Sequence, residues 1–457
     1  MLVPVGQLGA GVSEDEVAFG IAEGADAIAA DAGSTDSGAT YLALGLSKNM
    51  REAVKNDLRI LMKAQAMARI PLLVGSCGQS GGDAGVAWTA DIVVELCGEL
   101  GVFRRIALLH SEQRAETLKA KNSQGKIRPL PPLGPLDDAT IDECEHIVAV
   151  MGPEPYVAAL EANADIVLGG RTTDTAVLAA FPLFRGVAPG PAWHAGKVAE
   201  CGAQCTANPL GSRGVLVRID DRGFDIEALR DDNACTPDSV SAHMLYENSD
   251  PFRLIEPGGI LDVRAARYEQ IDARTVRVTG SRWEPMPYTM KLEGAAGGPY
   301  QTIMLIGIED PDVLSQLDVF HDRLLAALHK RVEQTLGDEA GAYDISLRIY
   351  GWNAVSGRPV PQGAAPPREV GVLFVATAES QALATRIAKA CNPFFFHFPV
   401  TSNIELPSYG FAFSPADIER GRVYEFKLNH VVEVEDPLEL VTTSWIDLRS
   451  PLVSGVA

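Results

Sequence analysis

The feature that most constrains the fold is an alternation of short apolar runs with longer helical stretches between residue 1 and about residue 181. Strands that alternate with helices form right-handed strand–helix–strand units, which place their strands side by side in a parallel sheet. We therefore predict a doubly wound parallel α/β sheet here, with an incomplete barrel as the alternative. The predicted strands are Ala27–Ala30, Pro71–Val74, Ile106–Leu109, Ile147–Val150 and Ile166–Leu168, and the predicted helices are Asn49–Arg69, Gly85–Leu100, Pro153–Ala162 and Thr173–Ala180.

The last third of the chain has a different order of elements, strand–helix–strand–strand–helix–strand, which is typical of a ferredoxin-like α+β region. Between the two parts lies an irregular α+β segment that includes the turn-rich stretch Lys291–Gly298. The predicted domains are residues 1–185 (ligand binding), 186–300 (a segment completing the site) and 301–457. The C-terminal elements are the strands Thr302–Ile308, Asp344–Tyr350, Glu369–Ala376 and Val423–Leu428, and the helices Pro311–Leu336 and Glu379–Cys391.

Composition bounds the location and the partners of the chain. A chain of 457 residues is too long for one ordinary core, and a net charge of -21 excludes the basic stripe that nucleic acid requires. The apolar runs are too short to span a membrane, and the N-terminus lacks the basic start of a signal peptide. Seven cysteines, an odd number, favour a reducing compartment over a disulfide framework. We expect a cytoplasmic protein that acts on a small molecule.

Small, polar and glycine-rich sequence follows the predicted strands, most clearly in Asp31–Asp36, Gly75–Gly78 and Gly169–Asp174. Open α/β sheets bind ligands at the carboxyl ends of their strands, where glycines let backbone N–H groups approach the ligand. Ordinary turn composition explains one such loop, but five loops in one domain favour a site. We expect Asp31, Gly75, Cys77, Gly170 and Arg171 to line one cleft. The predicted substrate-binding residues are Asp31, Ser34, Thr35, Gly75, Ser76, Gly78, Gly170, Arg171, Thr172 and Asp174.

Glu200 is the predicted general base, because burial beside Cys201 raises the pKa of a carboxyl toward working pH. The alternative is a carboxylate that caps the turn after it. A leaving hydroxyl also needs an acid or a metal, and Asp31, Asp36 and Lys197 are the available groups.

Arg171 follows a strand in a glycine context and suits bidentate binding of a carboxylate, although an ion pair with Asp174 explains it equally well. Backbone N–H groups of Gly75–Gly78 and Gly169–Arg171 are the predicted donors to a developing negative charge. Cys77 is the candidate nucleophile, or else a buried bystander. Ser80 matches G-x-S-x-G but lies past the strand end that a nucleophile elbow requires.

The sequence assigns no cofactor and no metal ligand. Two patterns would nevertheless allow a divalent metal ion. Asp31 and Asp36 suit Mg²⁺, but two carboxylates alone are a weak signal. Cys201 and Cys205 are four residues apart and would need His194 or His243 to complete a zinc site. The safer interpretation of His243 is a structural histidine that faces the core.

Three segments together resemble the acyclic terpene utilisation (AtuA) family: LGGRTTDTA at 168–176, GKVAECGAQCT at 196–206 and SVSAHMLYENSDP at 239–251. Lys197 stands where the family pattern has His, and Ala207-Asn208 stands where it has two glycines, so the chain resembles a divergent member. Longer relatives carry a small C-terminal domain that this chain lacks. The resemblance implies a bacterial catabolic enzyme, and the missing domain suggests a homo-oligomer or a separate small partner protein.

Three classes of function follow. The first is a hydro-lyase or C–C lyase that acts on a small hydroxy-carboxylate or its coenzyme A thioester. The second is a hydrolase or acyl-transfer enzyme that uses Cys77 or Ser80. The third is a non-catalytic binding subunit of a two-protein enzyme. We expect a hydro-lyase in which Arg171 binds the substrate carboxylate and Glu200 takes the proton alpha to it.

Overall fold

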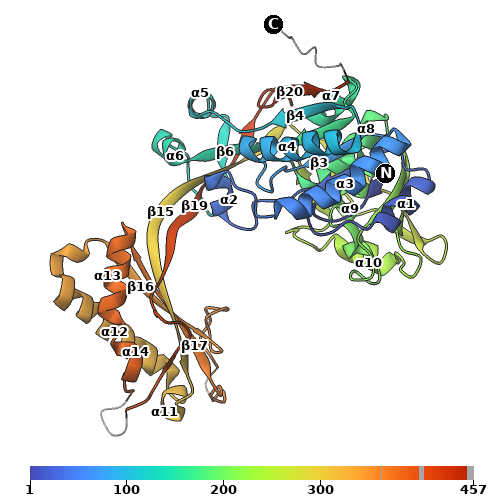
Figure 1. Ribbon diagram of the computed structural model, residues 1–457. Coiled ribbons are helices and arrows are strands. Elements are labelled where there is room, and N and C mark those ends of the chain that lie inside the picture. Colours follow the sequence, from blue (N-terminus) through green and yellow to red (C-terminus); the bar gives the residue numbers. More distant parts are fainter. Residues whose placement is uncertain (362, 401–405, 450–457) are drawn as a thin grey trace. The chain divides into compact units, whose positions relative to one another are not determined.

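A computed structural model describes residues 1–361, 363–400 and 406–449 of the chain (Figure 1). The chain forms two compact units. Unit 1 contains Met1–Ala296 and the C-terminal segment from Glu425, and unit 2 contains Gly297–Tyr424. Each unit is a mixture of helices and strands, as expected from the sequence. No helix among the described residues is both long enough and apolar enough to cross a membrane.

Unit 1 is built on a ten-stranded mixed sheet, of which only the central part is parallel. The prediction of a parallel sheet is therefore correct for its centre and wrong for its flanks. The flanking strands come largely from the segment 186–300, so the sheet continues across the predicted boundary at residues 185 and 186. The parallel strands, in order, are β1 (Leu2–Val3), β2 (Ile28–Asp31), β3 (Leu72–Gly75), β7 (Ile166–Gly169) and β4 (Arg105–His110). The antiparallel strands are β8 (Val215–Asp220), β9 (Gly223–Ala228), β13 (Thr275–Thr279) and β12 (Arg267–Gln270) beside β1, and β20 (Thr442–Asp447) beside β4.

Helices cover both faces of the parallel strands. Along β3, Leu72 and Val74 belong to one buried core, and Leu73 between them belongs to the other. Successive side chains of a strand point to opposite faces, so a strand with both faces covered must be apolar throughout. This is why the short apolar runs predicted these strands well. The first core includes α3 (Arg51–Ala68) and α4 (Asp83–Leu100), and the second includes α7 (Glu154–Glu161), α8 (Asp174–Phe184) and α9 (Pro189–Ala199).

Two sequence predictions fail around β6 (His146–Val150). It is a strand, as predicted, but it lies outside the main sheet and pairs antiparallel with β15 (Thr289–Ile308). The stretch Lys291–Gly298, predicted to be turn-rich, is part of β15. Its glycines serve close packing: a Cβ on Gly294 would lie 3.0 Å from the Cys144 Sγ and from the Leu428 Cβ. Glycine inside a strand often marks such a close approach, which local composition cannot distinguish from a turn.

The remaining elements of unit 1 are short. β10, β11 and β14 form a separate three-stranded antiparallel sheet, and β5 pairs with the end of β19 (Ile418–Glu433). Their bounds are α1 (Glu14–Ala22), α2 (Ala39–Leu44), α5 (Ala115–Ser123), β5 (Ile127–Pro129), α6 (Asp138–Glu143), α10 (Pro237–His243), β10 (Arg253–Glu256), β11 (Gly259–Asp262) and β14 (Arg282–Pro285).

Unit 2 has an antiparallel arrangement in which β17 lies between β16 and β15, with β19 next to β15. Its helices pack an apolar core against these strands, and the ferredoxin-like assignment stays a prediction. The predicted helix Pro311–Leu336 is divided into two at Ser315 and Gln316. The elements are α11 (Pro311–Leu314), α12 (Leu317–Leu336), β16 (Tyr343–Tyr350), β17 (Val370–Ala378), α13 (Gln381–Cys391), α14 (Phe394–His397), β18 (Gly410–Phe411) and β19 (Ile418–Glu433).

Candidate functional site

A polar cleft of about 370 Å³ lies in unit 1 at the carboxyl end of β2. Four of the predicted site residues line it, which are Asp31, Ser34, Asp36 and Asp174. This position follows from the topology, because the carboxyl ends of parallel strands meet at one edge of the sheet. We call this space the polar cleft. Its other polar lining residues include Gln7, Ser37, Gln79, Gln204, Ser212, Arg213, Tyr246 and Glu247, together with Cys201.

The other predicted loops meet beside the cleft but do not line it. The backbone N–H of Ser76 donates to the Gly170 carbonyl (3.1 Å), and that of Cys77 donates to the Gly169 carbonyl (2.9 Å). The Gly170 N–H in turn donates to the Leu109 carbonyl (2.7 Å). These three N–H groups hold neighbouring loops together and are therefore not free to donate to a substrate. Stabilisation of a negative charge by the other backbone groups of these loops stays a prediction. Gly75, Cys77, Gly170 and Arg171 are likewise absent from the residues that line the cleft.

The two candidate nucleophiles are buried rather than activated. Cys77 is completely buried, and burial raises the pKa of its thiol to about 12. A reactive cysteine needs the opposite environment, in which the thiolate is stabilised near neutral pH. Ser80 is also buried. The structure therefore supports the bystander interpretation of Cys77, and it gives no support to nucleophilic catalysis by either residue.

Arg171 is committed to a buried ion pair. Its Nε donates to the Glu293 Oε2 (2.9 Å), and one terminal nitrogen donates to the Ser76 Oγ (3.2 Å) and the Thr172 carbonyl (3.0 Å). Asp174 lies farther away, at 3.7 Å. The predicted role as a clamp for a substrate carboxylate is therefore not supported, because the guanidinium already holds protein groups.

Glu293, which the sequence did not single out, is the hub of this network. Besides Arg171, it accepts from the Thr35 Oγ1 (3.0 Å) and from the Lys291 Nζ (2.8 Å). Burial would raise the pKa of Glu293, but the charges of Arg171 and Lys291 hold it at about 2. Thr35, predicted to bind substrate, thus secures the loop after β2 to β15. Thr172 has a similar structural bond, with the Tyr156 hydroxyl at 2.8 Å from its Oγ1.

Glu200 and Lys197 form a second buried ion pair, one turn apart at the end of α9. Lys197 donates to the Glu200 Oε1, and the Thr175 hydroxyl donates to the Oε2 at 2.9 Å. Burial raises the pKa of Glu200 to about 7, and the charge of Lys197 opposes the rise. Both carboxylate oxygens are therefore occupied, and neither Glu200 nor Lys197 lines the polar cleft.

Asp31 combines burial, access to the cleft and a free oxygen. Its Oδ2 accepts from the Gly33 N–H (2.8 Å), whereas its Oδ1 is buried without a hydrogen-bond partner among the described residues. Burial raises the pKa of Asp31 well above its usual value, and the negative charge of Asp174 raises it further. Burial also raises the pKa of Asp174, against the charges of Arg171 and Lys197. Two interacting carboxyls of this kind titrate as a pair.

Three further features of the site escaped the sequence analysis. Gln79 adopts a φ of +78° and donates from its side chain to the Ser34 carbonyl (3.1 Å), which fixes one wall of the cleft. Glu247, also in the wall, has a φ of +58°. Such strained backbones cluster at functional sites. Glu256 is the third feature, because burial and the charge of Glu200 raise its pKa to about 8. No local sequence signal distinguishes these residues from ordinary loop residues.

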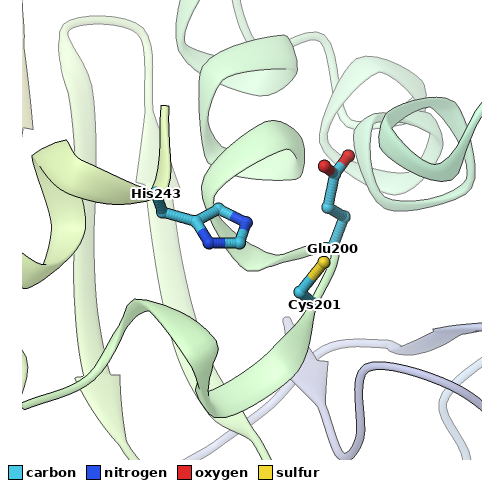
Figure 2. Close-up of side chains that lie close together, drawn as sticks. All are labelled: Glu200, Cys201 and His243. Atoms are coloured by element: carbon cyan, nitrogen blue, oxygen red, sulfur yellow. The ribbon is translucent and has the colours of Figure 1, made fainter. Parts of the chain in front are cut away.

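Glu200, Cys201 and His243 form a cluster with metal-ligand chemistry (Figure 2). One ligand atom from each residue lies within 4.8 Å of the others. The sequence had joined Cys201 with Cys205 and with His194 or His243, and only Cys201 and His243 meet. His194 instead hydrogen-bonds to Ser281 and Tyr268.

The other metal hypothesis used Asp31 and Asp36. Asp36 lies at the exposed rim of the cleft and accepts from the Ser34 hydroxyl (2.9 Å). Asp31 is buried, and its Oδ2 already accepts from the Gly33 N–H. The two carboxyls therefore lie in different environments, one buried and one exposed, and the structure gives no support to a metal site that they share.

Comparison with known proteins agrees with the resemblance of the sequence motifs. The model of the acyclic terpene utilisation family protein AtuA matches residues 79–409, so the chain belongs to this family. The match includes the loops after β7 and α9 and most of the residues described above. No curated protein and no solved structure matches the chain.

Proposed function

We propose that this member of the AtuA family is a hydro-lyase that removes water from a small hydroxy-carboxylate or its thioester. The family is named for the utilisation of acyclic terpenes, which fits a role in catabolism. The observation that carries the proposal is the pair Asp31 and Asp174, because two interacting carboxyls with raised pKa values line one small cleft. An elimination of water needs one group that accepts a proton and one that donates a proton.

The chemistry of the pair follows from its coupling. Two nearby carboxyls do not both ionise readily, so near neutral pH one is ionised and one keeps its proton. The ionised carboxylate takes the proton alpha to the substrate carboxyl, and the protonated one gives its proton to the leaving hydroxyl. The C–H and C–O bonds break, a C=C bond forms, and water leaves. The pair ends with the same total number of protons.

The environment favours Asp31 over Glu200 in this step. The two oxygens of Glu200 accept hydrogen bonds from Lys197 and Thr175, whereas the Asp31 Oδ1 accepts none from the residues that the structure describes. Burial of Asp31 also disfavours its charge, so a protonated Asp31 reduces the repulsion of an anionic substrate. Glu200 and Lys197 then serve as a charge pair behind the wall. The polar lining of the cleft suits a small polar acyl group better than an apolar terpene chain.

The test is Asp31→Asn, which keeps the shape and the Gly33 hydrogen bond but removes the titrating proton. We expect the turnover number to fall by about 10²–10⁴-fold, the usual contribution of an acid or base. The assay follows formation of the conjugated double bond over a panel of small 3-hydroxy acids and their coenzyme A thioesters.

Asp91→Asn is the matched control, because Asp91 lies on the exposed face of α4 in the same unit. It should behave as the wild type. Wild-type activity that survives Asp31→Asn in a folded protein would contradict the role of the pair. Wild-type protein that dehydrates no member of the panel would contradict the proposed reaction.

A further inference from the structure

Two helix ends that are about 40 residues apart in the sequence bring three ligand-type side chains together. Glu200 follows the last residue of α9 and Cys201 comes next, whereas His243 is the last residue of α10. The oxygen, sulfur and nitrogen atoms lie within 4.8 Å of one another. In Figure 2 the imidazole ring extends from α10 toward the Cys201 thiol and the Glu200 carboxylate.

His243 provides the independent sign of a missing ligand. The side chain is 5% exposed, and its Nε2 is buried without a hydrogen-bond partner among the described residues. A buried polar atom without a partner costs free energy, and native structures contain few of them. Tyr246 stacks on the ring with a centroid separation of 5.6 Å, which holds the ring in its orientation. The nitrogen is thus oriented and desolvated but makes no bond.

The donor set selects a class of ion. Thiolate and imidazole ligands favour Zn²⁺ and similar transition metals, whereas Mg²⁺ and Ca²⁺ prefer oxygen ligands. Bonds of about 2.0–2.3 Å to a tetrahedral ion would place the three ligand atoms roughly 3.3–3.8 Å apart. Since the ligand atoms all lie within 4.8 Å of one another, binding would require them to move closer by at most about an ångström.

We propose that Glu200, Cys201 and His243 bind one divalent transition-metal ion of the Zn²⁺ class. Three protein ligands leave one coordination position for water or a substrate oxygen, as in catalytic zinc sites. Cys201 lines the polar cleft, so the ion would lie at its wall. The inference does not depend on the lyase reaction, because it concerns binding of the ion alone.

The cation that contacts Glu200 in the structure is Lys197. Its ammonium group binds the Glu200 Oε1. A divalent ion that binds Glu200 must displace this ammonium or share the carboxylate with it, since two cations repel each other. Lys197→Met is therefore expected to strengthen metal binding, which is the opposite of what removal of a ligand does.

The experiment titrates the metal-stripped full-length protein with Co²⁺ and then with Zn²⁺. We expect one equivalent of Co²⁺ to produce a thiolate-to-cobalt absorption band, which Zn²⁺ abolishes and Mg²⁺ leaves unchanged. Cys201→Ser should remove the band, and His243→Ala should weaken binding by more than about 100-fold, because even outer partners of a metal site contribute 10–100-fold. Cys205→Ser is the matched control and should bind as the wild type, since its Sγ contacts the Gly202 carbonyl in the same turn.

Circular dichroism shows whether each variant folds. If Cys201→Ser or His243→Ala does not fold, Glu200→Gln replaces it as the variant that removes a ligand. Absence of the band in folded wild-type protein would overturn the proposal. So would a band that survives Cys201→Ser and His243→Ala, because it would indicate another site. Asp31→Asn should remove turnover and leave the metal stoichiometry at one. The two proposals therefore fail separately.

Discussion

The two units of the molecule differ in what they bury. Unit 1 buries ionisable side chains, among them Asp31, Arg171, Lys197, Glu200 and Glu293. In the described part of unit 2, the buried polar side chain is Thr302, and the rest of the core is apolar. Buried charge is costly unless it is paired, and groups with perturbed pKa values cluster at functional sites. The buried ionisable groups are therefore concentrated in unit 1, which is where the proposed site lies, whereas the described core of unit 2 is almost entirely apolar.

Ion pairs show the same contrast. The Arg171–Glu293 pair of unit 1 has side chains that are 9% and 4% exposed, whereas the Arg386–Glu339 pair of unit 2 is 52% and 71% exposed. Exposed pairs contribute little to stability, because solvent screens the charges and ordering the side chains costs entropy. Breaking a buried pair leaves a charge without a partner in a medium of low polarity. The same kind of substitution should therefore have very different effects at the Arg171–Glu293 pair and at the Arg386–Glu339 pair.

The largest expected effect is that of Glu293→Gln. It leaves the Arg171 guanidinium buried without its main counter-charge, and breaking a buried pair typically costs about 3–5 kcal/mol of the free energy of unfolding. Chemical denaturation followed by circular dichroism measures the change. Glu339→Gln in unit 2 is the control and should change stability little. Equal effects of the two substitutions would contradict the distinction between the units.

The next effect is a dependence of stability on pH that originates in unit 1. The folded pKa of Asp31 lies above its unfolded value of about 3.9, so the folded protein binds more protons in that window. Stability should therefore fall as pH rises from the unfolded pKa through the folded pKa, with a slope of up to about 1.4 kcal/mol per pH unit.

Asp31→Asn should flatten this dependence, as measured by denaturation across the acid range. Asp344→Asn, which changes an exposed carboxyl in β16 of unit 2, should leave it as it is in the wild type. A slope that is unchanged by Asp31→Asn would mean that other groups of unit 1 produce it.

The smallest effect concerns His110 at the end of β4. The Asp83 carboxylate, 3.2 Å from the His110 Nδ1, raises the pKa of the imidazole. A raised folded pKa stabilises the protein below the unfolded pKa of about 6.5, and this contribution is lost as pH rises through the folded value. Because both groups are partly exposed, we expect only a few tenths of a kcal/mol. Asp83→Asn should lower the thermal midpoint at about pH 5.5 more than at about pH 8.5; equal shifts would contradict the pair.

Several expectations remain predictions. The family match supports a catabolic role, but the reaction, a second copy of the chain and a separate small partner protein need the experiments above or a measurement of mass in solution. The domain boundaries predicted at residues 185 and 300 also differ from the limits of the compact units. The units divide between Ala296 and Gly297, within β15, and between Tyr424 and Glu425, within β19.

The sequence by itself determined the elements and the edge of the sheet where the site lies. The apolar run Pro71–Val74 predicted the buried strand Leu72–Gly75, because a strand with both faces covered by helices must be apolar throughout. The loop after β2 predicted Asp31, Ser34 and Asp36 as lining residues, because parallel strands end at one edge. These inferences depend on interactions that are local in the sequence or are imposed by chain topology.

Only the tertiary structure decided which side chains meet. Glu293 reaches Arg171 from a strand 122 residues away, and His243 reaches Cys201 from another helix. Tertiary contacts, and not residue type, also distinguished the candidates. Burial raises the pKa of the Cys77 thiol, Lys197 and Thr175 donate to the two oxygens of Glu200, and the Asp31 Oδ1 has no hydrogen-bond partner in the described part of the chain. The physical reason is that pKa values and ligand geometry depend on distances and on exclusion of water, and neither quantity is a property of a short sequence segment.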